Sequence, residues 1–427
     1  MQIHVVQSGQ TLYGIARTYG ISVADLSAAN QINPIQTLVI GQALVIPISG
    51  MYYFVQPGDT LYKIGRRFGV NHLRLAQMNA INPIDPLQIG FRLYIPPAPK
   101  TPVESNAYVE AVNGRFTDAA TSAVVEHAPL LTYLAPFSFE ARPDGSLATF
   151  DVSPIKGASA GSGAVLMMAV TNLENGQFSD AVGEAILNDT SVQDVLLDHI
   201  IEAAGEYGFQ DIHFDFEYLR PEDREPYNAF LKKAAQRLHA ERLLISTALA
   251  PKTSASQTGQ WYTAHDYRAH GEIVDFVVIM TYEWGYKYGP NMAVAPLNMV
   301  RRVLDYAVTE IPPEKIMLGI PNYGYDWPLP FEQGVTEAVT IGNVEAVQIA
   351  IRNGAEIQFD PVAASPYFRY WTEGTEHEVW FEDVRSLREK FALVMEYGLR
   401  GCGYWQIMRL FRANWLLLSD TFWIQKR

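Results

Sequence analysis

The chain has 427 residues, a net charge of −14, and 48% hydrophobic and 12% aromatic residues. A chain of this length accommodates about three domains, and its apolar content is sufficient to bury a large core. The excess negative charge argues against nucleic acid as a partner, because phosphate binding requires basic patches. No apolar run approaches the roughly 18 residues that span a bilayer, so no membrane partner is expected.

Cys402 is the only cysteine, which excludes an intrachain disulfide and is compatible with folding in a reducing cytosol. The first residues, Met1–His4, lack the charged, apolar and small-residue regions of a cleaved signal peptide. We expect a monomer that is made without a signal peptide and uses no metal or cofactor.

Two stretches near the start of the chain repeat at a fixed offset of 49 residues without a gap. Tandem small modules of this kind usually link two weak sites for a repetitive ligand and carry no chemistry themselves. The chemistry is therefore expected in the rest of the chain. The matching residues of the first copy are Val6, Gly9, Thr11, Leu12, Ile15, Gly20, Asn30, Asn33, Pro34, Gly41 and Pro47, which recur as Val55, Gly58, Thr60, Leu61, Ile64, Gly69, Asn79, Asn82, Pro83, Gly90 and Pro96.

Each copy is predicted to contain a helix that begins after a threonine. Thr11 and Thr60 stand where a hydroxyl would accept hydrogen bonds from the first free amides of the helices. These helices are predicted over Leu12–Tyr19 and Leu61–Phe68, and short flanking strands would close a βααβ unit of about 45 residues.

Both copies, at 1–48 and 51–97, resemble the LysM domain. They match its VxxGDTLxxIAxxFG and NxxxxxxLxxGxxLxIP patterns. The resemblance implies binding to the N-acetylglucosamine units of peptidoglycan or chitin. The alternative is a protein-binding repeat without affinity for sugars.

A proline-rich stretch, Pro96–Pro102, predicts a stiff linker at 98–104. Beyond it, in 105–427, eight apolar strand candidates alternate with helical patterns, which predicts an α/β fold, a (β/α)8 barrel. An open doubly wound sheet is the alternative, but no glycine-rich phosphate loop follows the first strand. The candidates are Tyr108–Val112, Leu130–Phe137, Ala164–Val170, Asp211–Glu217, Leu243–Ala248, Phe276–Tyr282, Lys315–Ile320 and Gly401–Ile407.

About fifty extra residues, at 328–381, separate the seventh and eighth strands. An inserted α+β segment at the C-terminal rim of a barrel would form one wall of a cleft, because the catalytic loops of this fold gather there. Trp371 and Trp380 lie in this segment, and we expect them to pack rather than to contact a ligand.

The fourth strand places four ionisable residues on one side. Asp211, His213, Asp215 and Glu217 share one parity, and apolar residues occupy the other. Polar groups inside a barrel are costly unless they are paired, and such groups tend to mark active sites. Same-side residues are about 6.6 Å apart along a strand, which puts Glu217 at the mouth and Asp215 one layer below. A purely structural network of buried charges is the alternative.

This strand resembles the DxxDxDxE motif of glycoside hydrolase family 18, and the resemblance covers roughly Ser105–Arg427. It implies that Glu217 is the general acid and that Asp215 positions the substrate acetamide. The other two family aspartates are replaced by Gln210 and His213. A charged His213 would favour ionised Asp215, whereas a neutral imidazole would leave Asp215 less supported.

Three further segments match the same family. Met280–Glu283 resembles its MxYD motif, which implies that Tyr282 binds the acetamide and that Glu283 replaces an aspartate. Trp405 matches the tryptophan that forms the floor of the sugar subsite. Gly319–Tyr325 resembles its GxPxYGx segment and makes Tyr323 and Tyr325 further substrate-binding candidates.

Together with the repeats and the His377–Asp383 segment, these motifs resemble the spore-germination N-acetylglucosaminidases of bacilli. The resemblance implies retaining, substrate-assisted hydrolysis of spore-cortex peptidoglycan or its fragments. It also implies synthesis in the mother-cell cytoplasm and a place in the spore coat. The alternatives are a chitinase or chitooligosaccharide hydrolase, and a non-catalytic sugar-binding coat protein. The latter class usually lacks the acid, which is present here as Glu217.

Overall fold

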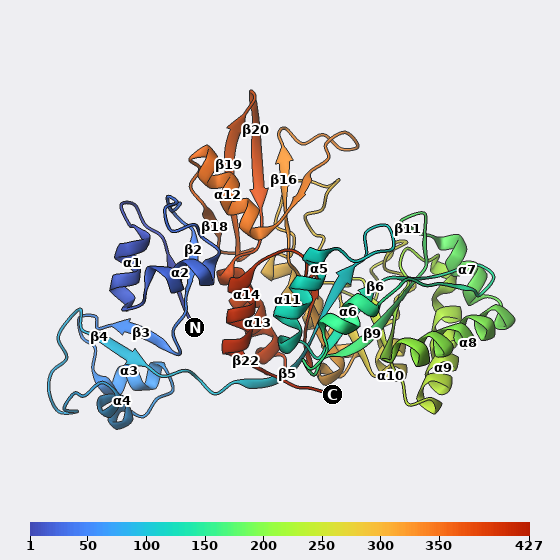
Figure 1. Ribbon diagram of the computed structural model, residues 1–427, viewed down its shortest axis with the longest axis horizontal. Coiled ribbons are helices and arrows are strands. Elements are labelled where there is room, and N and C mark those ends of the chain that lie inside the picture. Colours follow the sequence, from blue (N-terminus) through green and yellow to red (C-terminus); the bar gives the residue numbers. More distant parts are fainter.

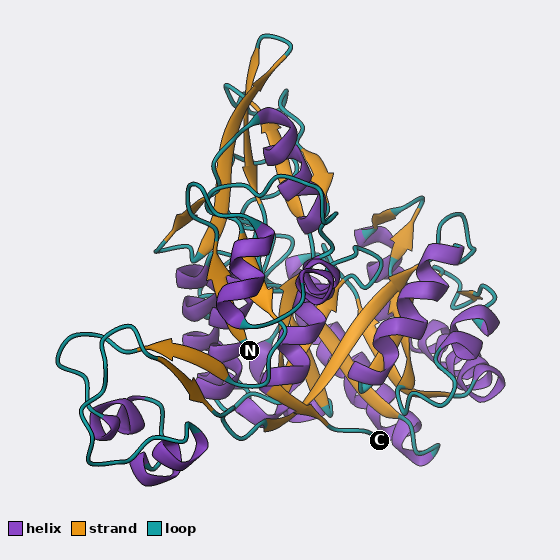
Figure 2. Cartoon of the chain, turned by 60° about the vertical axis from the view of Figure 1, so that its left-hand side comes forward, coloured by secondary structure: helices purple, strands orange, loops and turns teal.

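The computed structural model describes residues 1–427. Eight parallel strands close into a barrel, and helices cover its outside (Figures 1 and 2). The closed ring confirms the predicted (β/α)8 fold. In spatial order, the ring consists of β12 (Phe209–Asp215), β13 (Leu244–Leu249), β14 (Phe276–Ile279), β15 (Ile316–Pro321), β21 (Gly401–Trp405), β5 (Thr101–Glu110), β6 (Tyr133–Phe137) and β9 (Val165–Thr171), which pairs again with β12.

Most strand ends differ from the prediction by one or more residues, and three of the differences affect the linker and the site. β5 begins at Thr101, inside the expected linker, because its first residues pair with a short C-terminal strand, β22 (Phe422–Ile424). β12 ends at Asp215 and β14 ends at Ile279. Glu217 and Tyr282 therefore lie on loops just beyond their strands, where the backbone is free to turn toward the mouth of the barrel.

The barrel has an outer and an inner core. The outer core is a cluster of 74 buried side chains, most of them between the strands and the surrounding helices. The inner core is a smaller cluster with large side chains such as Tyr133, Met167 and Phe276.

The covering helices are α5 (Asp118–His127), α6 (Ser153–Ala158), α7 (Asp180–Leu187), α8 (Thr190–Tyr207), α9 (Arg224–Ala240), α10 (Tyr267–Ile273), α11 (Leu297–Glu310), α13 (Val384–Glu396) and α14 (Arg412–Thr421). Four short strands also lie outside the ring: β7 (Phe139–Ala141), β8 (Leu147–Ala148), β10 (Leu173–Glu174) and β11 (Gln177–Phe178).

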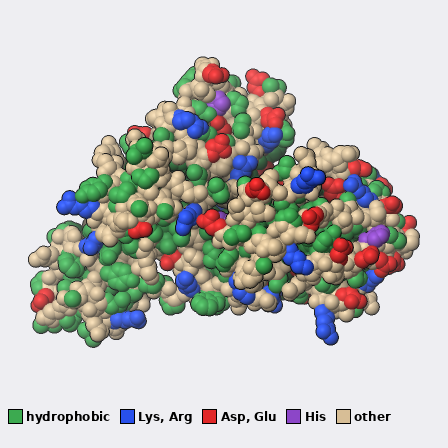
Figure 3. Space-filling view, in the orientation of Figure 1, with side chains coloured by type: hydrophobic (Ala, Val, Ile, Leu, Met, Phe, Trp, Pro, Cys, Tyr) green, Lys and Arg blue, Asp and Glu red, His purple; other side chains and the backbone are tan.

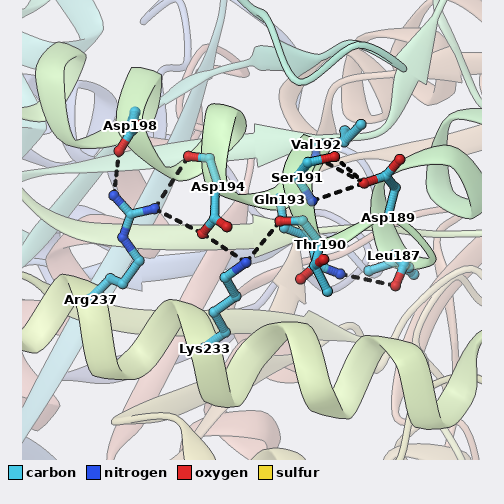
Figure 4. Close-up of polar contacts among 10 residues, drawn as sticks. All are labelled: Leu187, Asp189, Thr190, Ser191, Val192, Gln193, Asp194, Asp198, Lys233 and Arg237. Carbon is cyan, nitrogen blue, oxygen red and sulfur yellow. Dashed lines mark hydrogen bonds and ion pairs between the residues drawn. The ribbon is translucent and has the colours of Figure 1, made fainter.

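Helices α8 and α9, which precede and follow β12, are joined by ion pairs (Figure 4). Lys233 lies 2.7 Å from the Asp194 carboxylate, and Arg237 binds both Asp194 and Asp198. The Asp189 side chain accepts hydrogen bonds from the first amides of α8. Because Asp194 and Asp198 are exposed, solvent screens these pairs and they stabilise the helices little, so the helices are held mainly by the outer core.

The insertion forms a lobe that projects from the barrel (Figure 1). Its antiparallel sheet has the order β17-β16-β20-β19-β18 and begins at Gly324, four residues before the predicted start. Its elements are β16 (Gly324–Pro328), β17 (Val339–Ile341), α12 (Asn343–Asn353), β18 (Gln358–Asp360), β19 (Ser365–Thr372) and β20 (Thr375–Trp380).

The two N-terminal repeats are βααβ units, as predicted. Thr11 and Thr60 cap their first helices through their hydroxyl groups. The first repeat lies against the barrel and the insertion, whereas the second lies to one side (Figure 1). None of the helices has the length and apolarity needed to cross a membrane. The repeat elements are β1 (Gln2–Val5), α1 (Leu12–Tyr19), α2 (Val23–Asn30) and β2 (Ala43–Ile46), then β3 (Met51–Phe54), α3 (Leu61–Arg67), α4 (His72–Met78) and β4 (Arg92–Ile95).

Candidate active site

A cavity of about 1260 Å³ opens at the C-terminal ends of the barrel strands. Figure 3 shows the hollow between the insertion at the top and the loops around β11 at the right. Of the eight candidate residues, only His213 does not line this cavity. The lining candidates are Asp215, Glu217, Tyr282, Glu283, Tyr323, Tyr325 and Trp405.

The alternation predicted for β12 is confirmed. Ile212 and Phe214 belong to the outer core, whereas Asp211 and His213 are fully buried inside the barrel. Asp215 follows on the same side and reaches the cavity. The strand thus carries a column of polar groups from the barrel interior to its mouth.

Glu217 is held through its backbone on both sides. The Asn172 side chain accepts a hydrogen bond from the Glu217 amide at 2.9 Å and donates one to the Glu217 carbonyl at 2.9 Å. His265 lies 2.9 Å from the Phe216 carbonyl, and its other ring nitrogen accepts from the Ala250 amide. Burial lowers the pKa of His265 to about 4, so the neutral ring donates to Phe216. These contacts fix the position from which Glu217 reaches the cavity.

Glu217 and Asp215 form a buried carboxyl pair. Burial raises the pKa of both groups, and the negative charge of Asp215 raises the pKa of Glu217 further. The proximity of the two carboxyl groups lowers the pKa of Asp215 and raises that of Glu217. These mutual effects favour the proton on Glu217 over Asp215. This is the protonation state that a general acid needs.

Trp261, in the loop after β13, donates its indole N–H to the Glu217 carboxyl group. The indole also stacks on Tyr218, with ring centroids 6.1 Å apart. A donor favours the ionised carboxylate, so Trp261 limits the rise in the pKa of Glu217 that burial causes. The indole is thus placed to stabilise Glu217 after its proton has been transferred.

His213 is neutral and lies beneath the carboxyl pair. Its ring nitrogens lie 2.8 Å from the Tyr108 hydroxyl and 2.8 Å from the Ser246 hydroxyl, and Ser246 donates to Asp211 at 2.6 Å. Burial lowers the pKa of His213 to about 3 and raises that of Asp211 to about 7. Of the charged and neutral forms considered for His213, the neutral form is therefore present, and the imidazole contributes no positive charge to Asp215.

The opposite wall of the cavity is built around Glu283. The hydroxyl groups of Tyr323 and Tyr325 both donate to its carboxylate, with Tyr325 at 3.0 Å. Burial raises the pKa of Glu283, and the two hydrogen bonds oppose this rise. The neighbouring Tyr282 lines the same cavity. Its contact with a substrate acetamide stays a prediction.

Trp405, at the end of β21, lines the cavity and closes the inner core. Its ring packs edge-on against Phe137, with centroids 4.8 Å apart, and against Tyr108 at 5.5 Å. A flat apolar face at this position suits the C–H face of a pyranose ring. No cluster of His, Cys, Asp and Glu side chains is arranged to hold a metal ion.

Three residues of the site carried no recognisable signal in the sequence. Asn172, Trp261 and His265 lie on loops after β9 and β13, and their partners are 44 to 49 positions away along the chain. A polar residue directly after a barrel strand was the only available hint, and it applies to Asn172 alone.

Comparison with known proteins agrees with this geometry. The family model for glycosyl hydrolases family 18 matches residues 138–409, and the LysM model matches residues 4–47 and 53–96. This chain belongs to glycosyl hydrolase family 18. Its barrel is therefore that of a glycoside hydrolase, and its two repeats are LysM domains.

Similar proteins extend over the whole chain. A cortical fragment-lytic enzyme of Bacillus subtilis is 56% identical to this chain, and the alignment covers 100% of this chain and 99% of that enzyme. The crystal structure of the Bacillus megaterium spore cortex-lytic enzyme SleL is 47% identical, covers 100% of this chain and 99% of its own, and has a TM-score of 0.93. A chitinase structure from Chromobacterium violaceum is 25% identical, covers 75% of this chain and 98% of the chitinase chain, and has a TM-score of 0.68.

The contact between Trp261 and Glu217 predicts a shift in pH dependence. Trp261→Phe keeps an aromatic ring but removes the N–H donor, so the pKa of Glu217 should rise further. Because the acid acts in its protonated form, the high-pH limb of kcat/KM should move to higher pH. Profiles for Trp261→Phe and for the distant, exposed Trp423→Phe check this. Superimposable profiles for Trp261→Phe and the wild type would contradict the role.

Proposed function

We propose that this family 18 hydrolase is an N-acetylglucosaminidase that cleaves spore-cortex peptidoglycan or its fragments during germination. Two observations support the substrate: relatives named for cortex lysis match the full length of the chain, and two LysM domains precede the barrel. We also propose that the protein is spore-associated and acts as a monomer. The observation that carries the proposed activity is the buried Glu217 beside Asp215 in the cavity, where burial and the Asp215 charge raise the pKa of Glu217.

The proposed reaction begins with the N-acetylglucosamine unit above Trp405. Glu217 transfers its proton to the glycosidic oxygen as the bond from that oxygen to the anomeric carbon breaks. The carbonyl oxygen of the 2-acetamido group forms a new bond to the anomeric carbon. Asp215 accepts a hydrogen bond from the acetamide N–H, which becomes more acidic as the oxazolinium ring forms. This substrate-assisted route departs from the common two-carboxylate scheme.

The second step returns the site to its starting state. Glu217, now a carboxylate that accepts from Trp261, takes a proton from a water molecule. The water oxygen bonds to the anomeric carbon on the face that the leaving sugar vacated, and the oxazolinium ring opens to restore the acetamide. The product keeps the β-configuration, and Glu217 is protonated again.

The stereochemistry of the product tests this mechanism. Digestion of soluble cortex fragments should release chains that end in N-acetylglucosamine, with the β-anomer formed before mutarotation. Nuclear magnetic resonance during the first minutes measures the anomer, and mass spectrometry identifies the terminal sugar. Early formation of the α-anomer, or chains that end in muramic acid, would contradict the proposal.

Removal of the proton donor should abolish turnover while the fold is retained. Glu217→Gln keeps the size of the side chain and its contact with Trp261 but cannot supply a proton. We expect kcat to fall by roughly 10²–10⁴, with oligosaccharide binding preserved. Turnover assays and calorimetric titration with a soluble fragment measure both properties. Wild-type turnover in this variant would remove Glu217 from the mechanism.

A chitinase is the alternative enzyme, and one residue of the cavity favours peptidoglycan. Two cations, Lys287 and Arg409, line the cavity. Lys287 pairs with Glu337, whereas Arg409 forms no ion pair and lies close enough to Tyr325 to lower the pKa of that phenol. Peptidoglycan carries carboxylates on the lactyl ethers of its muramic residues or on the attached peptides, whereas chitin is uncharged. An unpaired guanidinium in this acidic protein is suited to bind such a carboxylate.

Arg409→Met should therefore discriminate between the two polymers. We expect kcat/KM to fall roughly 10-fold or more on muramic-acid-containing fragments, because a hydrogen bond to a charged group contributes about 1.5–3 kcal/mol. Chitooligosaccharides should be affected much less. Lys287→Met, which removes a paired cation from the same cavity, is the control. Equal losses on both substrates would argue against a carboxylate contact.

A further inference from the structure

The two LysM domains have the same fold but different surroundings. The second domain has its own small core and hydrogen-bonds only to the first, through contacts such as Tyr52 with Gln2 and Arg92 with the Thr18 carbonyl. The first domain contributes Val45 to the core of the barrel and Val39 to the core of the insertion. The first domain is thus packed into the catalytic domain, and the second is not.

Hydrogen bonds hold the first domain along the segment between α2 and β2. The Ile40 carbonyl accepts from the Ile357 amide at 2.9 Å, directly before β18. Arg385 donates to the Gly41 carbonyl at 3.2 Å, and the Gln36 side chain donates to Gln348 at 2.5 Å. The contacts therefore reach both the edge of the inserted sheet and helix α13.

At Gly41, the backbone of the first domain lies directly against the backbone of the insertion. A Cβ atom at Gly41 would lie 1.7 Å from the Ile357 carbonyl oxygen, so only glycine fits. The equivalent Gly90 of the second domain has nearly the same φ, +82° against +83°, but nothing lies within 4 Å of its Cβ position. The two positions thus share one backbone conformation, and only Gly41 has a packing constraint.

The docking residues also differ in kind between the domains. Val39 is 7% exposed against the insertion, and its counterpart 49 positions later is the polar Gln88. Ile40 is 37% exposed, whereas its counterpart Ile89 is 70% exposed. The first domain therefore has an apolar docking face that the second lacks.

The docked edge is connected to the active site through the paired strands of the inserted sheet. Strand β18 pairs with β19, β19 with β20, and β20 with β16, in which Tyr325 lies opposite Trp380. A Cβ at Gly324 would lie 2.3 Å from the Trp380 carbonyl oxygen, so β16 and β20 are in close backbone contact there. Tyr325 donates to Glu283 in the cavity. The sequence motif His377–Asp383 begins within β20 of this path, and its last residue pairs with Arg385 at 2.6 Å.

From this geometry we infer that the first LysM domain is a structural brace for the inserted wall of the cleft, and that the second domain, which is held only by the first, takes no part in this support. The brace holds β16 and its tyrosine against Glu283. Turnover of soluble fragments, which need no polymer anchoring, therefore depends on the first domain. The second domain contributes to polymer binding alone.

The test uses full-length protein and two undocking variants. Val39→Gln installs the residue that the second domain tolerates at this position, and Gly41→Ala introduces the clash with Ile357. Gly90→Ala is the matched control, because it adds the same strain at positive φ without a clash. Small-angle scattering measures undocking, kcat/KM on soluble cortex fragments measures the cleft, and sedimentation with cortex sacculi measures polymer binding.

We expect both undocking variants to show a larger radius of gyration and a roughly tenfold lower kcat/KM. The side chains of the inserted wall would still be present but would lie away from their productive positions in the cleft. Sedimentation should persist through the second domain. Gly90→Ala should match the wild type in scattering and in turnover of soluble fragments. Undocked variants with wild-type turnover, or undiminished compactness in both variants, would overturn the inference. Scattering reports on docking independently of the proposed substrate.

Discussion

The site depends on keeping two carboxyl groups close together and out of water. Two buried negative charges would be costly, so the pair favours one proton, which Glu217 holds in preference to Asp215. The surrounding contacts serve this arrangement: Asn172 and His265 fix the backbone at Glu217, and Trp261 offers a donor for the charge that proton transfer leaves behind.

The polar column below the pair supplies no positive charge. Burial keeps His213 uncharged and raises the pKa of Asp211 to about 7, so neither group stabilises an ionised Asp215 electrostatically. On the other side of the cavity, Glu283 with its two tyrosines belongs partly to the barrel and partly to the insertion. The cleft is therefore only as rigid as the attachment of that insertion, which the first LysM domain supports.

Much of the fold and most of the cavity could be predicted from the sequence, because both follow from local patterns. The alternation of polar and apolar residues around Asp215 predicts a strand with one face inside the barrel and one outside. The capping threonines predict helices that begin at Leu12 and Leu61. The strand ends, the partners of Glu217 and the charge of His213 could not be predicted, since they depend on contacts between distant loops and on burial. The docking of Gly41 was hidden for another reason: the repeats match at this glycine, and only the surroundings differ.

The location of the proton can be measured directly. Infrared difference spectroscopy of the wild type against Glu217→Gln at neutral pH should show the loss of a protonated carboxyl band, while the ionised Asp215 band remains. The wild type against Asp215→Asn should show the loss of a carboxylate band. If Glu217→Gln removed only a carboxylate band, Glu217 would be ionised in the resting enzyme and could not act as the acid.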